Sequence, residues 1–140
     1  MTTSSLSTSR TLQSRAARRG LVALGAVVAA VLVWVVAVPV LGATVTVPER
    51  PGSTNRTELP FGDVVVAAAV AALAGWALLA VLERFTTRAR AIWTVIAVAV
   101  LVLTMPFMPG FTVTERLVLG AMHLTVAGVL IPGLRQTSGR

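Results

Sequence analysis

Residues 20–48, GLVALGAVVAAVLVWVVAVPVLGATVTVP, contain no charged side chain, and this stretch decides which kind of fold the chain can adopt. Three more charge-free stretches follow it, at residues 64–82, 91–114 and 117–134. The hydrocarbon core of a bilayer is about 30 Å thick, and a helix needs roughly 20 mostly apolar residues to cross it. Each stretch is long enough or nearly so. The sequence therefore predicts an all-α protein, a polytopic four-helix transmembrane bundle.

The composition supports residence in a membrane. Of the 140 residues, 56% are hydrophobic, which is more than an ordinary soluble domain of this size contains. The net charge of +7 comes from arginine alone, because the sequence has no lysine. The arginines border apolar stretches and no aromatic groove accompanies them, so anionic lipid headgroups are the expected partner and nucleic acid is not. Cysteine is absent, which excludes disulfides and thiolate chemistry.

The charge clusters set the expected boundaries of the domains. We expect a flexible basic cytoplasmic tail at residues 1–19, a four-span domain at residues 20–134 and a short cytoplasmic tail at residues 135–140. The spans are expected at about residues 21–45, 64–82, 91–109 and 113–132, joined by a Pro-rich loop at residues 46–62, irregular or briefly extended, and a tight connector at residues 83–90.

Local signals predict how the spans begin and end. Pro39 is expected to loosen the last turns of the first span. Asp63 is the expected N-cap of the second span, and Thr112 and Glu115 have the spacing of a capping box at the start of the fourth. The expected helix ends are the group Pro106, Pro109 and Gly110 for the third span and Pro132-Gly133 for the fourth.

The arginines also predict an orientation. Nine of them fall on the side of the two tails and the connector, and three fall on the opposite side. Because positive residues concentrate on the cytoplasmic side, both termini should be cytoplasmic, in a plasma membrane. Trp93 follows the connector, where an interfacial anchor on the inner face would lie. The Arg18-Arg19 pair resembles an export signal, but the apolar run behind it is too long, so we expect an uncleaved span.

Small residues recur at helical spacing on two spans. Ala67, Ala71 and Gly75 follow one another every four residues on the second span, and Gly25 and Ala29 do so on the first. Such ridges let helices approach closely inside a bilayer. They predict a packing seam against another span, a second copy of the chain or a partner membrane protein, although an alanine-rich sequence also produces this spacing by chance.

His123 is the only ionisable residue inside any of the four charge-free stretches, which makes it the candidate intramembrane polar site. Gly120 and Ala127 share its helical face, so the ring is expected to point into the bundle. Two roles are open for it. One is structural, a neutral ring bonded to a carbonyl or to Thr94 or Thr104, and the other is binding a ligand or a proton.

The connector at residues 83–90 carries a second candidate site. Arg84, Arg88 and Arg90 are placed to contact anionic lipid headgroups. Their alternative role is to hold the connector on the cytoplasmic side, with Glu83 paired to Arg88.

Motifs for catalysis are lacking. The sequence contains no P-loop, nucleotide-binding glycine motif, His/carboxylate metal cluster or nucleophile elbow, so no cofactor, metal or enzymatic activity is predicted. The favoured function is a non-enzymatic structural or partner-binding membrane component. The alternative is a small transporter or channel subunit that uses His123, and the lack of a carboxylate deep in a span weighs against coupled cation export.

Three segments carry a family resemblance: ERFTTRARAIWT at residues 83–94, MHLTVAGVLIPGL at residues 122–134, and the segment from Trp34 to Pro39. With these, the chain resembles, over about residues 20–134, an uncharacterised family of small four-span membrane proteins of actinobacteria. The resemblance implies four spans in a plasma membrane and implies no activity or ligand.

Overall fold

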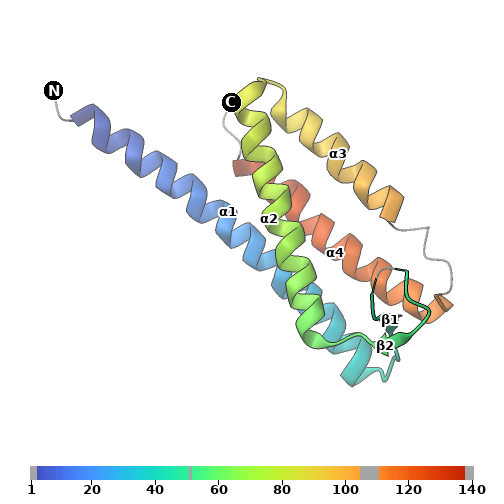
Figure 1. The fold of residues 1–140 in the computed structure, drawn as a ribbon. Helices are drawn as coiled ribbons and strands as arrows, with labels where there is room; N and C mark the ends of the chain where they lie inside the picture. The colour runs from blue at the N-terminus through green and yellow to red at the C-terminus, as the bar shows by residue number, and fades with distance from the viewer. Residues whose placement is uncertain (1–2, 51, 105–110, 138–140) are drawn as a thin grey trace.

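The protein is an assembly of four α-helices with one short hairpin, seen in a computed structural model that describes residues 3–50, 52–104 and 111–137 (Figure 1). The predicted all-α fold class is confirmed. The elements are α1 (Thr3–Val35), the π-helical turn η1 (Val36–Val40), the strands β1 (Thr46–Pro48) and β2 (Arg56–Glu58), and the helices α2 (Phe61–Phe85), α3 (Ala89–Thr104) and α4 (Val113–Thr137).

Three segments are long and apolar enough to cross a membrane, namely Ser14–Val40, Phe61–Phe85 and Val113–Thr137. Their outward faces carry large apolar side chains, such as Val70 at 60% exposure and Leu117 at 69%. A continuous apolar surface of this kind is unfavourable in water and typical of a lipid-facing helix. Helix α3 has 16 residues, about 24 Å at 1.5 Å each, and is shorter than the other three. Its predicted end at Pro106, Pro109 and Gly110 lies outside the described residues.

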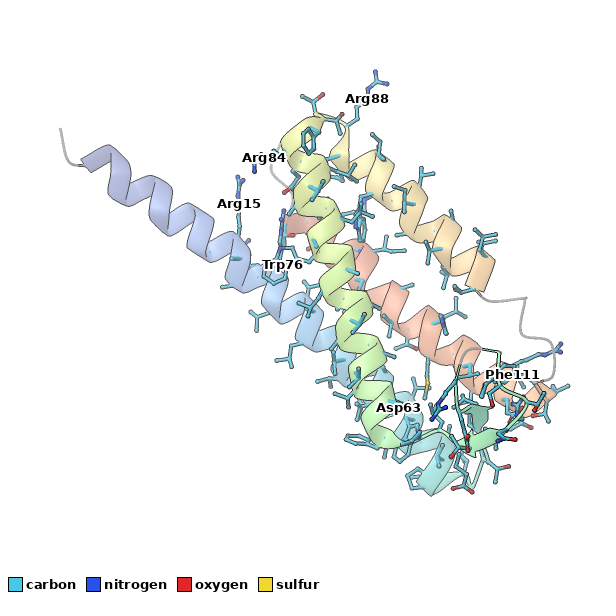
Figure 2. All side chains as sticks on the ribbon, in the orientation of Figure 1. Arg15, Asp63, Trp76, Arg84, Arg88 and Phe111 are labelled. Carbon is cyan, nitrogen blue, oxygen red and sulfur yellow. The ribbon has the colours of Figure 1, made fainter. Side chains whose placement is uncertain are left out.

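The charged residues gather at the two ends of the bundle. Figure 2 shows Arg15, Arg84 and Arg88 at one end and Asp63 with Phe111 at the other. On α2, Asp63 and Glu83 are 20 positions apart, a rise of about 30 Å, which matches the thickness of a bilayer core. The chain thus has two polar ends separated by one apolar layer, as a membrane requires.

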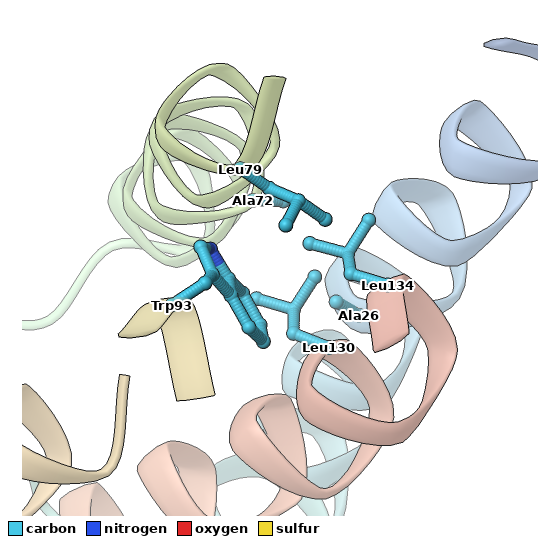
Figure 3. Close-up of a cluster of buried hydrophobic side chains, with 6 residues drawn as sticks. All are labelled: Ala26, Ala72, Leu79, Trp93, Leu130 and Leu134. Carbon is cyan, nitrogen blue, oxygen red and sulfur yellow. The ribbon is translucent and has the colours of Figure 1, made fainter. Parts of the chain in front are cut away.

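The core is built on α1, which packs against both α4 and α2. Small side chains permit this close contact: Ala26 and Ala72 are buried in one cluster, and Ala30 and Ala68 in the other. Figure 3 shows the first cluster, in which Ala26 and Ala72 pack with four larger side chains: Leu79, Trp93, Leu130 and Leu134. The buried small residues adjoin the predicted ridge positions of α1 and α2 and are not those residues themselves.

Three of the local predictions are confirmed. Pro39 lies within η1, where the i→i+4 pattern widens to a π-helical turn because proline has no N–H to donate. The capping box at the start of α4 is also present. The Thr112 N–H donates to Glu115 Oε2 at 2.7 Å, and the Glu115 N–H donates to Thr112 Oγ1 at 3.2 Å. The loop at residues 46–62 is briefly extended, as expected, because β1 and β2 pair antiparallel.

Two predicted helix boundaries are wrong. Helix α2 begins at Phe61 with Pro60 at the N-cap position, so Asp63 lies inside the first turn. Its carboxylate still favours that helix end through the helix dipole. Helix α4 does not stop at Pro132-Gly133 but continues to Thr137. A proline here removes one backbone donor, and the packing of α4 against α1 outweighs that loss.

The structure also differs from the predicted tail. Helix α1 begins at Thr3, so residues 3–19, for which a flexible tail was predicted, are helical and continuous with the first span. This N-terminal part of α1 extends away from the other helices in Figure 1. Helix formation is cooperative, and a long apolar helix supplies the nucleus from which Ala- and Arg-containing turns extend.

Candidate functional site

An open apolar cavity of about 460 Å³ lies between α2, α3 and α4. Ala67, Ala71 and Gly75, which form the ridge predicted from the sequence, line its wall. Their small side chains leave the cavity wide on the side of α2. On α2, Ala68 and Ala72 thus pack against the other helices, whereas the predicted ridge residues beside them face the cavity.

His123 is half-buried and lines this cavity. Its Nδ1 lies 2.7 Å from the carbonyl oxygen of Leu119, one turn earlier on α4. Because a carbonyl only accepts, Nδ1 must carry the proton, and Nε2 of the neutral ring is then an acceptor. A carbonyl partner was one of those expected, whereas Thr94 and Thr104 are not partners. Each of these threonines donates its hydroxyl hydrogen to a carbonyl of its own helix.

Two other polar side chains, those of Asp63 and Thr104, line the same cavity. The Thr104 hydroxyl donates to the Val100 carbonyl at 2.8 Å, which leaves its oxygen lone pairs as acceptors. The Asp63 carboxylate is acceptor-only when ionised. Sequence reasoning placed Asp63 at a helix end but did not connect it with His123, because the two lie on different helices.

Trp93 lines the cavity near the start of α3, the end of the helix that follows the connector. It was predicted to be an interfacial anchor, and that prediction is wrong, because the side chain is only 2% exposed. Its indole Nε1–H donates to the Gly75 carbonyl at 2.8 Å. The ring therefore joins α3 to α2 inside the core (Figure 3).

A partly buried ion pair, with the Arg19 side chain 8% and the Glu83 side chain 29% exposed, lies where α1, α2 and α4 meet. One nitrogen of the Arg19 guanidinium, Nη2, lies 2.7 and 2.8 Å from the two carboxylate oxygens of Glu83. Arg19 Nε donates to the Thr137 hydroxyl at 3.2 Å. The predicted pairing of Glu83 with Arg88 is therefore wrong. The sequence held one signal for the true partner: Glu83 is the only acid on the predicted inner side, and Arg19 directly borders the first span.

A second polar network fixes the hairpin to α4 at the other end. Glu115 is buried, and its Oε1 accepts hydrogen bonds from the Thr46 N–H at 2.9 Å and the Thr46 hydroxyl at 2.5 Å. Arg56 Nη2 lies 3.2 Å from Oε2, and its guanidinium stacks 4.5 Å from the Phe111 ring centre. Glu115 thus combines the helix cap with the attachment of the loop, a role that the capping-box spacing alone did not indicate.

The predicted lipid-contacting arginines come from the connector between α2 and α3. Arg84 and Arg88 are exposed, and Arg90 is half-buried. Figure 2 shows Arg84 and Arg88 at the same end as Arg15 of α1. The structure therefore brings the basic N-terminal segment and the connector to one end of the bundle, and it separates both from His123.

Comparison with known proteins yields one match, which covers nearly the whole chain. Residues 10–140 match a family model described as a family of unknown function (DUF6069). No curated protein and no solved structure matches the chain. The matched range includes the cavity and both polar networks. The chain belongs to DUF6069, a family of unknown function.

Proposed function

We propose that the protein is a non-enzymatic binding component of the plasma membrane that receives a hydrophobic partner in the cavity between α2, α3 and α4. The observation that carries this proposal is the cavity itself, which lies in the apolar layer and is lined almost entirely by apolar side chains. Ligand cavities are typically apolar with a few polar groups. A cavity of this kind, open within a bilayer, favours an apolar occupant.

The arrangement of the titratable groups supports binding over catalysis. Glu83 and Glu115 are held in structural networks at opposite ends of the bundle. Among the residues lining the cavity, the titratable ones are Asp63 and His123. Within the described ranges, no three His, Asp or Glu side chains gather closely enough to hold a metal ion. General acid–base chemistry needs a pair positioned by contacts within reach of one reacting group, and in the described part of the chain Asp63 and His123 share no hydrogen bond or ion pair.

Both termini are proposed to be cytoplasmic. The arginines of α1 and of the connector lie at one end of the bundle, as the positive-inside rule favours for a cytoplasmic face. Fusing a reporter to the C-terminus tests this orientation. Green fluorescent protein should be fluorescent there and alkaline phosphatase inactive. Active phosphatase at the C-terminus would refute the proposed orientation or the even number of spans.

A photoreactive residue tests binding at the cavity. Introduced in place of Ala71, on the cavity wall, it should crosslink in native membranes to a species that is absent when Val70 is replaced. Val70 is the matched control because it is adjacent on α2, and its side chain is exposed on the outer face and absent from the cavity lining. Identical crosslinks from both positions, to bulk lipid alone, would count against a specific occupant. A second copy of this chain is one partner that the crosslink would identify.

The exposed connector arginines are proposed to contact anionic lipid headgroups. Arg84 and Arg88 are exposed at the end of the bundle assigned to the cytoplasmic face, and Arg90 adjoins them. Each basic residue near an anionic membrane surface contributes about 1 kcal/mol of attraction, screened by salt.

A transport function is the second candidate, and one observation favours it. His123 and Asp63, both able to exchange protons, line the same cavity. Protein reconstituted in liposomes should then move protons or a hydrophobic cation, and His123→Ala should abolish that movement. Binding without any flux would leave the first proposal standing and remove this one.

A further inference from the structure

We propose that the occupant of the cavity is an amphiphilic amine, a molecule with an apolar body and a protonated amino group that donates hydrogen bonds. This inference rests on the proposed function, because it names the chemical class that the same cavity accepts. It is carried by the polar groups of the cavity wall and by their position along the cavity.

On the described part of the cavity wall, the polar side-chain groups left for a ligand are acceptors. His123 Nδ1 is engaged by the Leu119 carbonyl, so the neutral ring offers only the Nε2 lone pair. Thr104 uses its hydroxyl hydrogen on its own helix and retains oxygen lone pairs. The Trp93 indole N–H, the one side-chain donor of the apolar part, is occupied by the Gly75 carbonyl. A ligand that matches this wall must therefore bring hydrogen-bond donors.

The charge of the wall selects a cationic donor. Among the described residues that line the cavity, Asp63 contributes the only formal charge. Its carboxylate has no hydrogen-bond or ion-pair partner in the described part of the chain, whereas Glu83 and Glu115 are both paired. A hydrogen bond between two charged groups is roughly twice as strong as a neutral one, so an ammonium group complements this site better than a hydroxyl group does.

The acceptors lie toward one end of the cavity. Asp63 is in the first turn of α2 and Thr104 is the last residue of α3, both distant from the connector that joins these helices. The other end is lined by Leu78, Trp93 and Ile131. This end is apolar, because the Trp93 N–H is already bonded to the Gly75 carbonyl. An amphiphile would place its amino group near Asp63 and its apolar body against Trp93.

The size of the cavity suits such a molecule. A volume of about 460 Å³ falls within the roughly 300–1,000 Å³ of typical ligand sites. Alkylammonium chemistry has two sources in a cell: the headgroup of an aminolipid already in the bilayer, and a soluble hydrophobic amine. Both present the same donor cation, and the experiment separates them.

The test uses the full chain in phosphatidylcholine nanodiscs, a lipid that has no N–H donor. Four amphiphiles of equal chain length serve as probes: dodecylamine, dodecyltrimethylammonium, dodecanol and laurate. Dodecylamine should bind at least about tenfold more tightly than the other three, since only it has both charge and donors. A bromine at the end of its chain should quench Trp93, which is in the apolar end.

Matched variants assign the effect to the wall. Asp63→Asn should weaken dodecylamine about tenfold and leave dodecanol unchanged. Glu49→Gln is the control for general surface charge, because Glu49 is an exposed acid outside the cavity lining. His123→Phe should weaken both dodecylamine and dodecanol. Phosphatidylethanolamine in the nanodisc should compete with dodecylamine if the natural ligand is an aminolipid, and should have no effect if it is a soluble amine.

Two outcomes would overturn the inference and leave the proposed function intact. In the first, all four amphiphiles bind equally and Ala71→Trp blocks them all, so the cavity takes any apolar chain. In the second, none binds, while the photoreactive residue at position 71 still captures a partner. Binding of dodecylamine that survives Ala71→Trp would place the amine elsewhere and also refute the inference.

Discussion

Gly133→Ala tests whether α1 and α4 are packed as closely as the structure has them. A Cβ at position 133 would lie 2.6 Å from Val22 Cγ1 and 2.8 Å from Val22 Cγ2. Carbon atoms prefer separations of about 3.5–4.0 Å, so both contacts are too short by roughly 1 Å. Valine in a helix has one strongly preferred χ1 rotamer and cannot turn both methyl groups away. The two helices must therefore separate locally, at a cost of about 1–3 kcal/mol of unfolding free energy.

Gly128→Ala is the matched control on the same helix, because a Cβ there would meet nothing within 4 Å. It isolates the gain in helix propensity, which is up to about 1 kcal/mol and is shared by both substitutions. Denaturation in detergent micelles, followed by circular dichroism, should rank Gly128→Ala above Gly133→Ala by about 1–3 kcal/mol. Adding Val22→Ala should rescue Gly133→Ala, with a coupling energy of similar size. A difference below about 0.5 kcal/mol, or no rescue, would refute the close contact, since distant sites simply add within that margin.

Three further predictions concern the polar ends. Arg19→Gln should destabilise the protein by about 1–3 kcal/mol in the same denaturation assay, because it leaves Glu83 unpaired in a partly buried site. Arg18→Gln, at an exposed neighbouring position, should change little, and equal effects of the two substitutions would contradict a stabilising Arg19–Glu83 ion pair. Glu115→Gln should lower the free energy of unfolding by about 2 kcal/mol and speed tryptic cleavage after Arg56, because an amide cannot accept every bond that the carboxylate accepts. An unchanged cleavage rate would contradict the attachment of the hairpin to Glu115. Replacing Arg84 and Arg88 together with glutamine should weaken the binding of anionic lipid by about 2 kcal/mol at low salt, as measured by native mass spectrometry. The binding of zwitterionic lipid should be unaffected, and an equal loss of both lipid types would contradict a charge-based contact.

Features set by neighbouring residues were predictable from the sequence. The bonds of the capping box, between Thr112 and Glu115, join residues three positions apart, so the sequence spacing nearly determines them. The widened turn at Pro39 follows from the missing N–H of a single residue. The all-α fold follows from the length of the charge-free stretches, because a bilayer permits few other structures.

Features set by the tertiary arrangement were not predictable from the sequence. Arg19 and Glu83 are 64 positions apart, and their pairing requires α1, α2 and α4 to meet at one depth. The pair Pro132-Gly133 has the local signature of a helix stop. In the structure α4 continues through this pair, and Gly133 packs closely against Val22 of α1, a contact that neighbouring residues in the sequence do not indicate.

His123 shows the boundary between these two cases. Its position inside a span was visible in the sequence, and so was a carbonyl as one of its expected partners. The cavity was not predictable from the sequence, because its wall is formed by residues of three helices, α2, α3 and α4. The Asp63 side chain acquires a role only through that cavity, since on its own helix it is simply an acid in a first turn.

The distribution of packing explains why the cavity lies beside α3. In a bilayer, association between helices depends on close van der Waals packing and polar contacts, because lipid offers no hydrophobic driving force. Helices α1, α2 and α4 have both: alanine and glycine contacts along their length and an ion pair at one end. On α3 the buried residues are Ala89 and Trp93, both in its first two turns. Beyond Trp93 the described part of α3 has no buried residue, and its side chains, among them Ile96, Val100 and Thr104, line the cavity instead of filling it.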